Sequence, residues 1–423
     1  MVKASKKFSF IQNIKKHSFL VTFAALFVIF LFLRFYLLLP RANFGWDQVD
    51  SAWAANDILV NKHFIINGPV AKGNSGIYMG PLYYFAVMPF YFFTHLNPIA
   101  SPIFQSLLAI GNFFVLFFIT KKIFGKSTAL FASFIATFSV TIMNYDRVQS
   151  AYYLIVPVSY LIFYALYKVI TGEPKYLMLL AIGVGLSFHV DFTSVLYPIF
   201  ILLALPFFPR TKELVKYILF ALPILLIFFL PTILVDIATK HSTSGNINSL
   251  LHVYYHGFHV RRFLQIAHDG FISFEQILQF PFLRFSVYLV LPVFMFIYYK
   301  INPTKKSWLL FYLMAIWVIV PWVVFSTYSG ELTDYYFSFS RDIAIATIAY
   351  IAVFLLQQKI LLKFIPVFFF LFYAITSMQQ FFAMPAGNLL VTEANVRQII
   401  REKGKIPFKD HDASSYMYYA FTK

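Results

Sequence analysis

The chain has 423 residues, of which 60% are hydrophobic and 12% are charged, and its mean hydropathy is +0.73. A water-soluble globular protein carries about 25% charged residues, so this composition excludes a soluble fold and predicts an integral membrane protein. The formal net charge of +17 would suit a nucleic-acid-binding protein if the chain were soluble. In a membrane protein basic residues collect in cytoplasmic loops instead, so we expect no nucleic-acid partner.

The first predicted element is a membrane-spanning helix over 19–39. Its apolar run is too long for the core of a cleaved signal peptide and lacks a small-residue cleavage site. Lysines precede it, at Lys3, Lys6, Lys7, Lys15 and Lys16. We therefore expect this helix to be retained, with its N-terminus in the cytoplasm. Arg34 lies close enough to the outer end to extend its side chain to water.

About 20 mostly apolar residues are needed for a helix to cross a bilayer. Eleven stretches are predicted as spans: 19–39, 98–120, 127–143, 152–167, 176–188, 192–208, 217–235, 283–299, 308–325, 337–356 and 360–378. The stretch 81–94 is short and contains Pro89, so we expect it to dip into the bilayer without crossing. The predicted fold is all-α, with a membrane domain over 1–383 and a short polar tail outside over 384–423.

Charge placement agrees with this count. With the N-terminus inside, every short inner loop is basic, as the positive-inside rule requires. These loops hold Lys121, Lys122, Lys126, Lys168, Lys175, Arg210, Lys212, Lys216, Lys300, Lys305, Lys306, Lys359 and Lys363. Of the acids in the membrane domain, only Glu173 and Glu213 fall inside. We expect a prokaryotic plasma membrane with the working surface on its outer face.

Two predicted outer loops are long, 40–80 and 236–282, and loops of that length are usually functional or disordered. The first contains a predicted interfacial helix at 50–61, and the second an amphipathic stretch at 247–266. After the last span, residues 394–403 are predicted to form a helix.

Asp47 and Asp50 are the first candidates for chemistry. If the helix begins at Trp46, the two carboxylates share one face; otherwise Asp47 caps the helix. A carboxylate at the edge of the bilayer, beside aromatic residues, can lose enough hydration to act as a base.

Arg147 allows two interpretations. It can pair with Asp146 or reach a lipid phosphate, or its forked donors can clamp the phosphate of a substrate. Arg341 and Asp342 could likewise form a structural pair at a helix start.

The outer histidines suit hydrogen bonding better than metal binding. His189 and Asp191 lie in one tight turn, and two ligands do not make a metal site. A second group would share one helical face, at His252, His256 and His259. Arg261 and Arg262 beside these residues oppose a metal ion and favour a phosphate surface. We expect neither a metal nor a cofactor.

Four short stretches carry a family resemblance: 45–48 (Gly-Trp-Asp-Gln), 80–84 (Gly-Pro-Leu-Tyr-Tyr), 144–153 and 334–337 (Asp-Tyr-Tyr-Phe). In this order the sequence resembles the multispanning GT-C glycosyltransferases that use polyprenyl-phosphate sugars, the relatives of protein O-mannosyltransferase and aminoarabinose transferase. It departs from their pattern in four places. Gln48 stands for the usual Glu, Ser150 for a second Arg and Asp334 for His, while residues 78–80 lack the family's Lys.

The resemblance implies inverting transfer of a sugar from a polyprenyl-phosphate donor to a hydroxyl of a lipid, glycan or protein acceptor. Asp47 is the carried-over general base, and Asp50 is a possible substitute for it. Candidates for binding the donor phosphate are Arg147, Lys72, Arg261 and Arg262. Candidates for binding substrate are Gln48, Tyr83, His189, Asp334 and Tyr335.

Two alternatives share the same span count. A flippase or transporter of lipid-linked sugars should carry ionisable groups near the middle of the bilayer, whereas here they cluster at its outer edge. A lipid-linked glycan ligase is harder to separate from the transferase. A soluble nucleotide donor is unsupported, since the sequence contains no glycine-rich phosphate loop or dinucleotide fingerprint.

Overall fold

The computed structural model describes residues 2–71, 76–148, 150–238, 242–270, 287–330, 332–404 and 413–422. The α-helices are α1 (Val2–Phe35), α2 (Trp46–Leu59), α3 (Leu82–Phe93), α4 (Ala100–Phe124), α5 (Lys126–Phe138), α6 (Val140–Tyr145), α7 (Ile155–Ile170), α8 (Leu177–Phe188), α9 (Leu196–Ala204), α10 (Lys212–Ala238), α11 (Ser242–Tyr254), α12 (Val260–Gly270), α14 (Val287–Ile301), α15 (Lys305–Ser326), α16 (Arg341–Leu356), α17 (Ile360–Phe382), α18 (Leu389–Lys403) and α19 (Ala413–Thr422). Short 3₁₀ turns are η1 (Ala151–Leu154), η2 (Pro174–Tyr176), η3 (Phe192–Val195), η4 (Leu205–Phe207) and η6 (Asp334–Ser340).

Seven helices in the described part of the chain are long and apolar enough to cross a membrane. They are Ser18–Phe35, Ala100–Phe124, Ala151–Ile170, Lys212–Ala238, Lys305–Ser326, Tyr335–Leu356 and Leu362–Phe382. Each coincides with one of the eleven predicted spans, which confirms a multispanning helical fold. The helix at Leu82–Phe93 has 12 residues, too few to span a bilayer unaided.

The other four predicted spans correspond to shorter helices, and one of them shows why. The predicted span 127–143 is divided between α5 and α6, because Ser139 adopts an extended conformation (ψ 116°) between them. Its hydroxyl accepts a hydrogen bond from the Ile142 amide at 3.3 Å and so caps α6.

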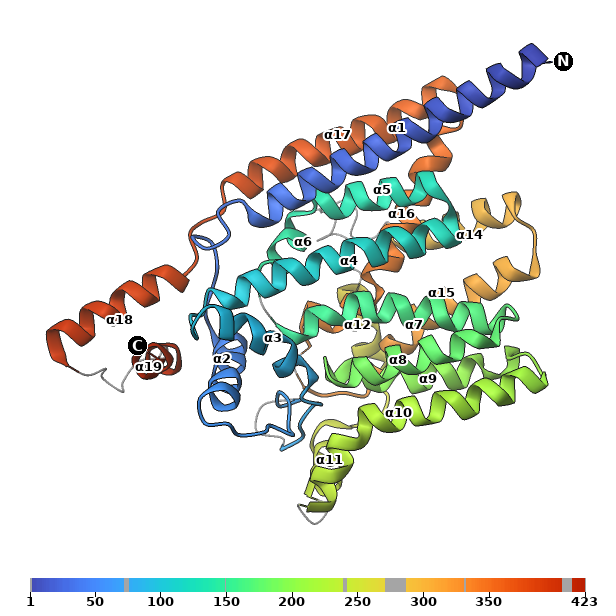
Figure 1. Ribbon diagram of the computed structural model, residues 1–423. Helices are drawn as coiled ribbons and strands as arrows, with labels where there is room; N and C mark the ends of the chain where they lie inside the picture. The colour runs from blue at the N-terminus through green and yellow to red at the C-terminus, as the bar shows by residue number, and fades with distance from the viewer. Residues whose placement is uncertain are drawn as a thin grey trace.

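The long helices form a bundle around α7, with α2, α3 and α19 gathered at one end (Figure 1). The span containing α7 is 72% buried inside the protein, whereas the span of α10 is only 6% buried. Lipid is as apolar as these side chains, so an edge helix such as α10 needs no further cover.

A second core lies at the end of the bundle that carries α2. Its buried members include Phe44, Tyr91, Leu389, Tyr418 and Tyr419. Residues after 384, predicted as a polar tail, thus contribute to this core, and the Leu389 amide bonds the Ala42 carbonyl at 3.1 Å. The loop that follows α1 is therefore held by the C-terminal segment.

The prediction that His252, His256 and His259 share one helical face is wrong. The amphipathic stretch 247–266 contains parts of two helices, because α11 ends at Tyr254 and α12 begins at Val260. Between them Tyr255 forms an isolated antiparallel bridge with Tyr328, and Gly257 has φ +77°, which a continuous helix cannot accommodate. The three histidines predicted to share a face therefore do not lie on one helix.

Candidate functional site

The candidate site begins at the first turn of α2. Gly45 is the N-cap, and the Gln48 side-chain oxygen accepts a hydrogen bond from the Gly45 amide at 2.9 Å. Because Gly45 is the N-cap and the helix begins at Trp46, Asp47 lies inside the first turn and does not cap the helix. With the helix starting at Trp46, Asp47 and Asp50 lie three residues apart on neighbouring positions of one face.

Both carboxylates line a cavity of about 450 Å³. Ser150 donates a hydrogen bond from its hydroxyl to Asp47 Oδ2 at 2.9 Å, and the Tyr84 hydroxyl makes a short hydrogen bond to Asp50 Oδ2. A third carboxylate, Asp191, lines the same cavity and caps η3 by accepting from the Thr193 amide at 2.8 Å.

Burial raises the pKa of Asp47, and the hydrogen bond from Ser150 partly opposes this rise. Burial likewise raises the pKa of Asp50, against the effect of Tyr84, and the charge of Asp47 raises it further. A base works best when its pKa is near the operating pH, so raised carboxyl pKa values suit proton abstraction.

Stacked tyrosines form one wall of this cavity. The ring centroids of Tyr152 and Tyr335 are 4.3 Å apart with an interplanar angle of 23°, and Tyr335 continues onto Tyr336 at 4.6 Å. Tyr83, predicted to bind substrate, is another lining residue. Flat aromatic faces beside carboxylates are a common way to hold the apolar face and hydroxyls of a ring-shaped polar ligand.

A second cavity of about 430 Å³ adjoins the first and is lined mainly by apolar and aromatic side chains. The two share Ala71, Phe192 and Tyr336 as lining residues. Ala71 is held there by a small hairpin, in which its amide bonds the Ile77 carbonyl at 2.7 Å. A polar compartment therefore lies next to an apolar one.

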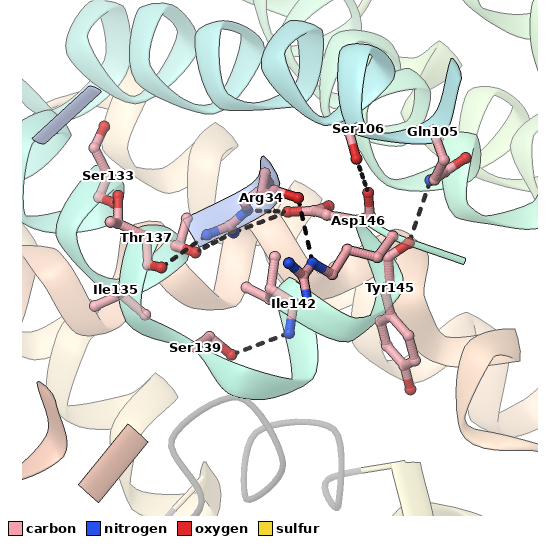
Figure 2. A network of polar contacts seen from close by, with 12 residues as sticks. Arg34, Gln105, Ser106, Ser133, Ile135, Thr137, Ser139, Ile142, Tyr145 and Asp146 are labelled. Atoms are coloured by element: carbon pink, nitrogen blue, oxygen red, sulfur yellow. Dashed lines mark hydrogen bonds and ion pairs between the residues drawn. The ribbon is translucent and has the colours of Figure 1, made fainter. Parts of the chain in front are cut away.

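Arg34 does not extend to water, as the sequence suggested, but is fully buried. Its guanidinium lies 2.8 Å from Asp146 Oδ2 and donates to the carbonyls of Ala136 and Thr137, both at 2.8 Å (Figure 2). The correction has a physical cause. These carbonyls end α5 and need donors, and a cation is favoured at a helix C-terminus.

Arg147 also lies away from both cavity walls. It donates hydrogen bonds to the carbonyls of Arg34, at 3.3 Å, and of Tyr36, and it stacks over the Phe381 ring at 5.0 Å. Burial, with the charges of Arg41 and Arg34 nearby, lowers the pKa of Arg147 to about 10. Its described contacts tie down the end of α1 rather than face the site.

His189 lies beside the site without lining it. Its Nδ1 accepts from the Leu82 amide at 3.3 Å, which leaves Nε2–H to donate to the Phe228 carbonyl at 2.9 Å. Both ring nitrogens are thus used by the backbone of neighbouring helices. Burial lowers the pKa of His189, which favours this neutral form.

The remaining predicted residues fall in three places. Arg261 is exposed and Arg262 donates to the Gly330 carbonyl at 2.9 Å; neither lines a cavity. Lys72 lies outside the described residues, but it follows Ala71 in the chain. Asp334 begins η6 and its side chain lies outside the description, while its neighbour Tyr335 lines the first cavity.

Sequence reasoning missed Asp191, Ser150 and Tyr152 as lining residues. One signal was available, because all three were expected on the outer face, close to residues already chosen. Within the described residues, no group of three His, Asp or Glu side chains is placed to hold a metal ion.

Comparisons with known proteins agree with this architecture. Residues 81–235 match the profile of the dolichyl-phosphate-mannose-protein mannosyltransferase family. The fold is similar to that of ArnT from Cupriavidus metallidurans in the apo state (TM-score 0.55, 14% identity, 96% of this chain and 76% of that chain). A structure of ArnT bound to undecaprenyl phosphate has the same TM-score and identity, and covers 95% of this chain and 75% of that chain.

The archaeal oligosaccharyltransferase AglB from Archaeoglobus fulgidus, in complex with an inhibitory peptide and a dolichol phosphate, is also similar (TM-score 0.56, 12% identity). The match covers 96% of this chain and 60% of AglB. No curated protein sequence matches this chain. The resemblance to multispanning polyprenyl-phosphate glycosyltransferases is thus confirmed by a family profile over one segment and by the fold over nearly the whole chain.

Proposed function

We propose that this chain is a membrane glycosyltransferase that moves a sugar from a polyprenyl-phosphate donor to an acceptor hydroxyl on the extracytoplasmic face, with inversion. The observation that carries the proposal is the pair of neighbouring cavities. A polar compartment with Asp47 and Asp50 shares the lining residues Ala71 and Tyr336 with an apolar one. A substrate with a sugar at one end and a hydrocarbon chain at the other has matching polarity.

In the proposed reaction Asp47 takes the proton of the acceptor hydroxyl as its oxygen attacks the anomeric carbon. The bond between that carbon and the phosphate oxygen breaks, and polyprenyl phosphate leaves with the electron pair. Attack opposite the leaving group inverts the anomeric centre. The sugar would rest against the Tyr152 and Tyr335 rings, beside Asp50 and Tyr83.

The departing phosphate needs positive charge more than it needs a proton. The described residues that line the two cavities include no Lys or Arg. Lys72 is the best candidate, because it is the next residue in the chain after Ala71, which lines both cavities. Arg262 is a second, since the loop it contacts at Gly330 precedes the lining residues Leu332 and Thr333. The acceptor could be a lipid, a glycan or a protein.

The test is to incubate purified protein in detergent with a set of polyprenyl-phosphate sugars and an acceptor mixture, and to measure released polyprenyl phosphate. We expect Asp47→Asn to lower the transfer rate by about 10²–10⁴-fold while the protein still folds, because an amide cannot accept the proton. Asp57→Asn is the matched control, since Asp57 is an exposed carboxylate on the same helix. Unchanged transfer by Asp47→Asn would remove Asp47 from the reaction.

A further inference from the structure

Ser150 is the side chain most directly engaged with the proposed base. Its hydroxyl is buried, with 2% of the residue exposed, and it donates to Asp47 Oδ2 at 2.9 Å. Within the described part of the chain, the other oxygen, Oδ1, has no hydrogen-bond partner. One oxygen of the carboxylate is therefore fixed, while the other remains available on a residue that lines the cavity.

The segment that carries Ser150 is anchored at its other end. Asp146 is paired with the buried Arg34, and Arg147 bonds the carbonyls at the end of α1. Asp146 and Arg147 precede Ser150 by four and three residues. Figure 2 shows the polar network around Arg34 and Asp146, which fixes the chain shortly before Ser150.

The hydroxyl of Ser150 selects one protonation state of Asp47. A carboxylate accepts this hydrogen bond better than a neutral carboxyl, so the bond favours the charged form. It acts against burial, which raises the pKa of Asp47. Other titratable groups facing Asp47 are Asp50 on α2, Tyr84 on α3, Tyr152 and Tyr153 on η1, and Asp191 across the cavity.

We infer that Ser150 is a positioning residue that aims Asp47 into the cavity through Oδ2 and keeps it ready to accept a proton through Oδ1. This inference rests on the proposed function, and it assigns a role to a position where the family resemblance has Arg. An arginine there would add a positive charge close to Asp47. A serine supplies one directed donor without adding a charge.

The experiment measures the pH dependence of transfer for Ser150→Ala and Ser150→Thr in the full-length protein. Asp47 must be deprotonated to act, so the rate falls as pH drops through the pKa of Asp47. Loss of the hydroxyl raises that pKa further, so Ser150→Ala should move this acid limb to higher pH. That shift should be about 1–2 pH units, the size expected for a hydrogen bond to a charged group. The maximal rate should also fall, because the carboxylate is no longer held in one orientation. Ser150→Thr keeps a hydroxyl, so its transfer rate should fall at the same acidic pH as that of the wild type.

Ser187→Ala is the control for losing a buried serine hydroxyl. Ser187 is fully buried on α8, and its hydroxyl donates only to the Val184 carbonyl of its own helix, at 2.7 Å. This variant should leave the acid limb where it is. If Ser150→Ala keeps the wild-type limb while Asp47→Asn abolishes transfer, the inference fails and the proposed function stands.

A second measurement does not depend on activity. Infrared difference spectra of wild type minus Asp47→Asn report the carboxyl band of protonated Asp47 as the pH is lowered. The band should appear at higher pH in the Ser150→Ala background than in the Ser187→Ala background. Equal titration in both backgrounds would overturn the inference even if no sugar donor is ever accepted.

Discussion

Gly80 is the residue that lets His189 approach the start of α3. A Cβ built at this position would lie 1.9 Å from His189 Nδ1, the atom that accepts from the Leu82 amide. The imidazole cannot retreat without breaking its contact with the Phe228 carbonyl. The absence of a side chain at Gly80 is therefore a packing requirement.

We expect Gly80→Ala to lower the free energy of unfolding by about 1–3 kcal/mol, the usual cost of forcing extra volume into a packed interior. Thermal unfolding in detergent measures this cost. Gly111→Ala is the matched control, because no atom lies within 4 Å of its Cβ and it sits inside α4. That change should be neutral or stabilise the helix. Equal melting temperatures for both variants would contradict the packing role.

Which polar residues reach the cavity could be predicted only in part. Asp47 and Asp50 followed from their position after a span and from the three-residue spacing. Arg147 and His189 carry equally suggestive side chains, yet Nε and Nη2 of Arg147 and both ring nitrogens of His189 bond backbone groups. A sequence shows that a group can bind phosphate or substrate. It does not show which unpaired helix carbonyls compete for that group.

Arginines satisfy the carbonyl ends of three helices. Arg34 bonds the end of α5, Arg147 bonds the end of α1, and Arg41 bonds the Phe381 and Phe382 carbonyls of α17 at 2.8 and 3.1 Å. Each cation thus meets the negative end of a helix dipole where water is scarce. Together they join α1, α5 and α17 on the side of the bundle that carries the site.

Breaking the Arg34–Asp146 pair should be costly. Removal of one partner leaves the other charge buried without compensation, typically at about 3–5 kcal/mol. We expect Arg34→Met to lose that much stability, measured by chemical or thermal unfolding in detergent. Lys168→Met removes one partner of a more exposed pair with Glu173, whose side chains are 24% and 36% exposed, and should cost less than about 1 kcal/mol. Similar losses in both would contradict a special role for the buried pair.

The sequence predicted where helices occur better than it predicted where they are interrupted. Hydropathy located the seven full spans, since a run of about 20 apolar residues has few other uses. It did not reveal the break at Ser139 or the interruption at Gly257. Both depend on a single side chain or backbone angle inside a stretch whose composition otherwise favours one continuous helix.

At the scale of the whole molecule, the C-terminal segment and the segment around α2 pack together as one unit. Tyr418 is fully buried, packs edge-on against Phe44 and Trp53, and donates its hydroxyl to the Leu96 carbonyl at 2.9 Å. These contacts cross more than 300 residues of sequence. Hydropathy could not predict them, because residues after 384 are polar on average.

We expect Tyr418→Ala to loosen the helix that carries Asp47, since truncation of a buried aromatic typically costs about 3–5 kcal/mol. Limited proteolysis within residues 40–80 measures this local loosening, and we expect faster cleavage there in Tyr418→Ala. Thermal unfolding measures the stability of the whole protein for comparison. Val391→Ala is the control, because Val391 is 54% exposed on α18. Equal cleavage rates for the two variants would show that the C-terminal segment does not stabilise the helix that carries Asp47.

The Arg34–Asp146 contact joins positions 112 residues apart. A chain inserted into the membrane in the order of its synthesis therefore places α1 in lipid well before Asp146 has been made. Until α5 follows, the guanidinium at the end of the first span has neither its carboxylate nor the α5 carbonyls, and it gains the carboxylate only after α6. The ion pair that fixes the first span can therefore form only after α6 has been inserted.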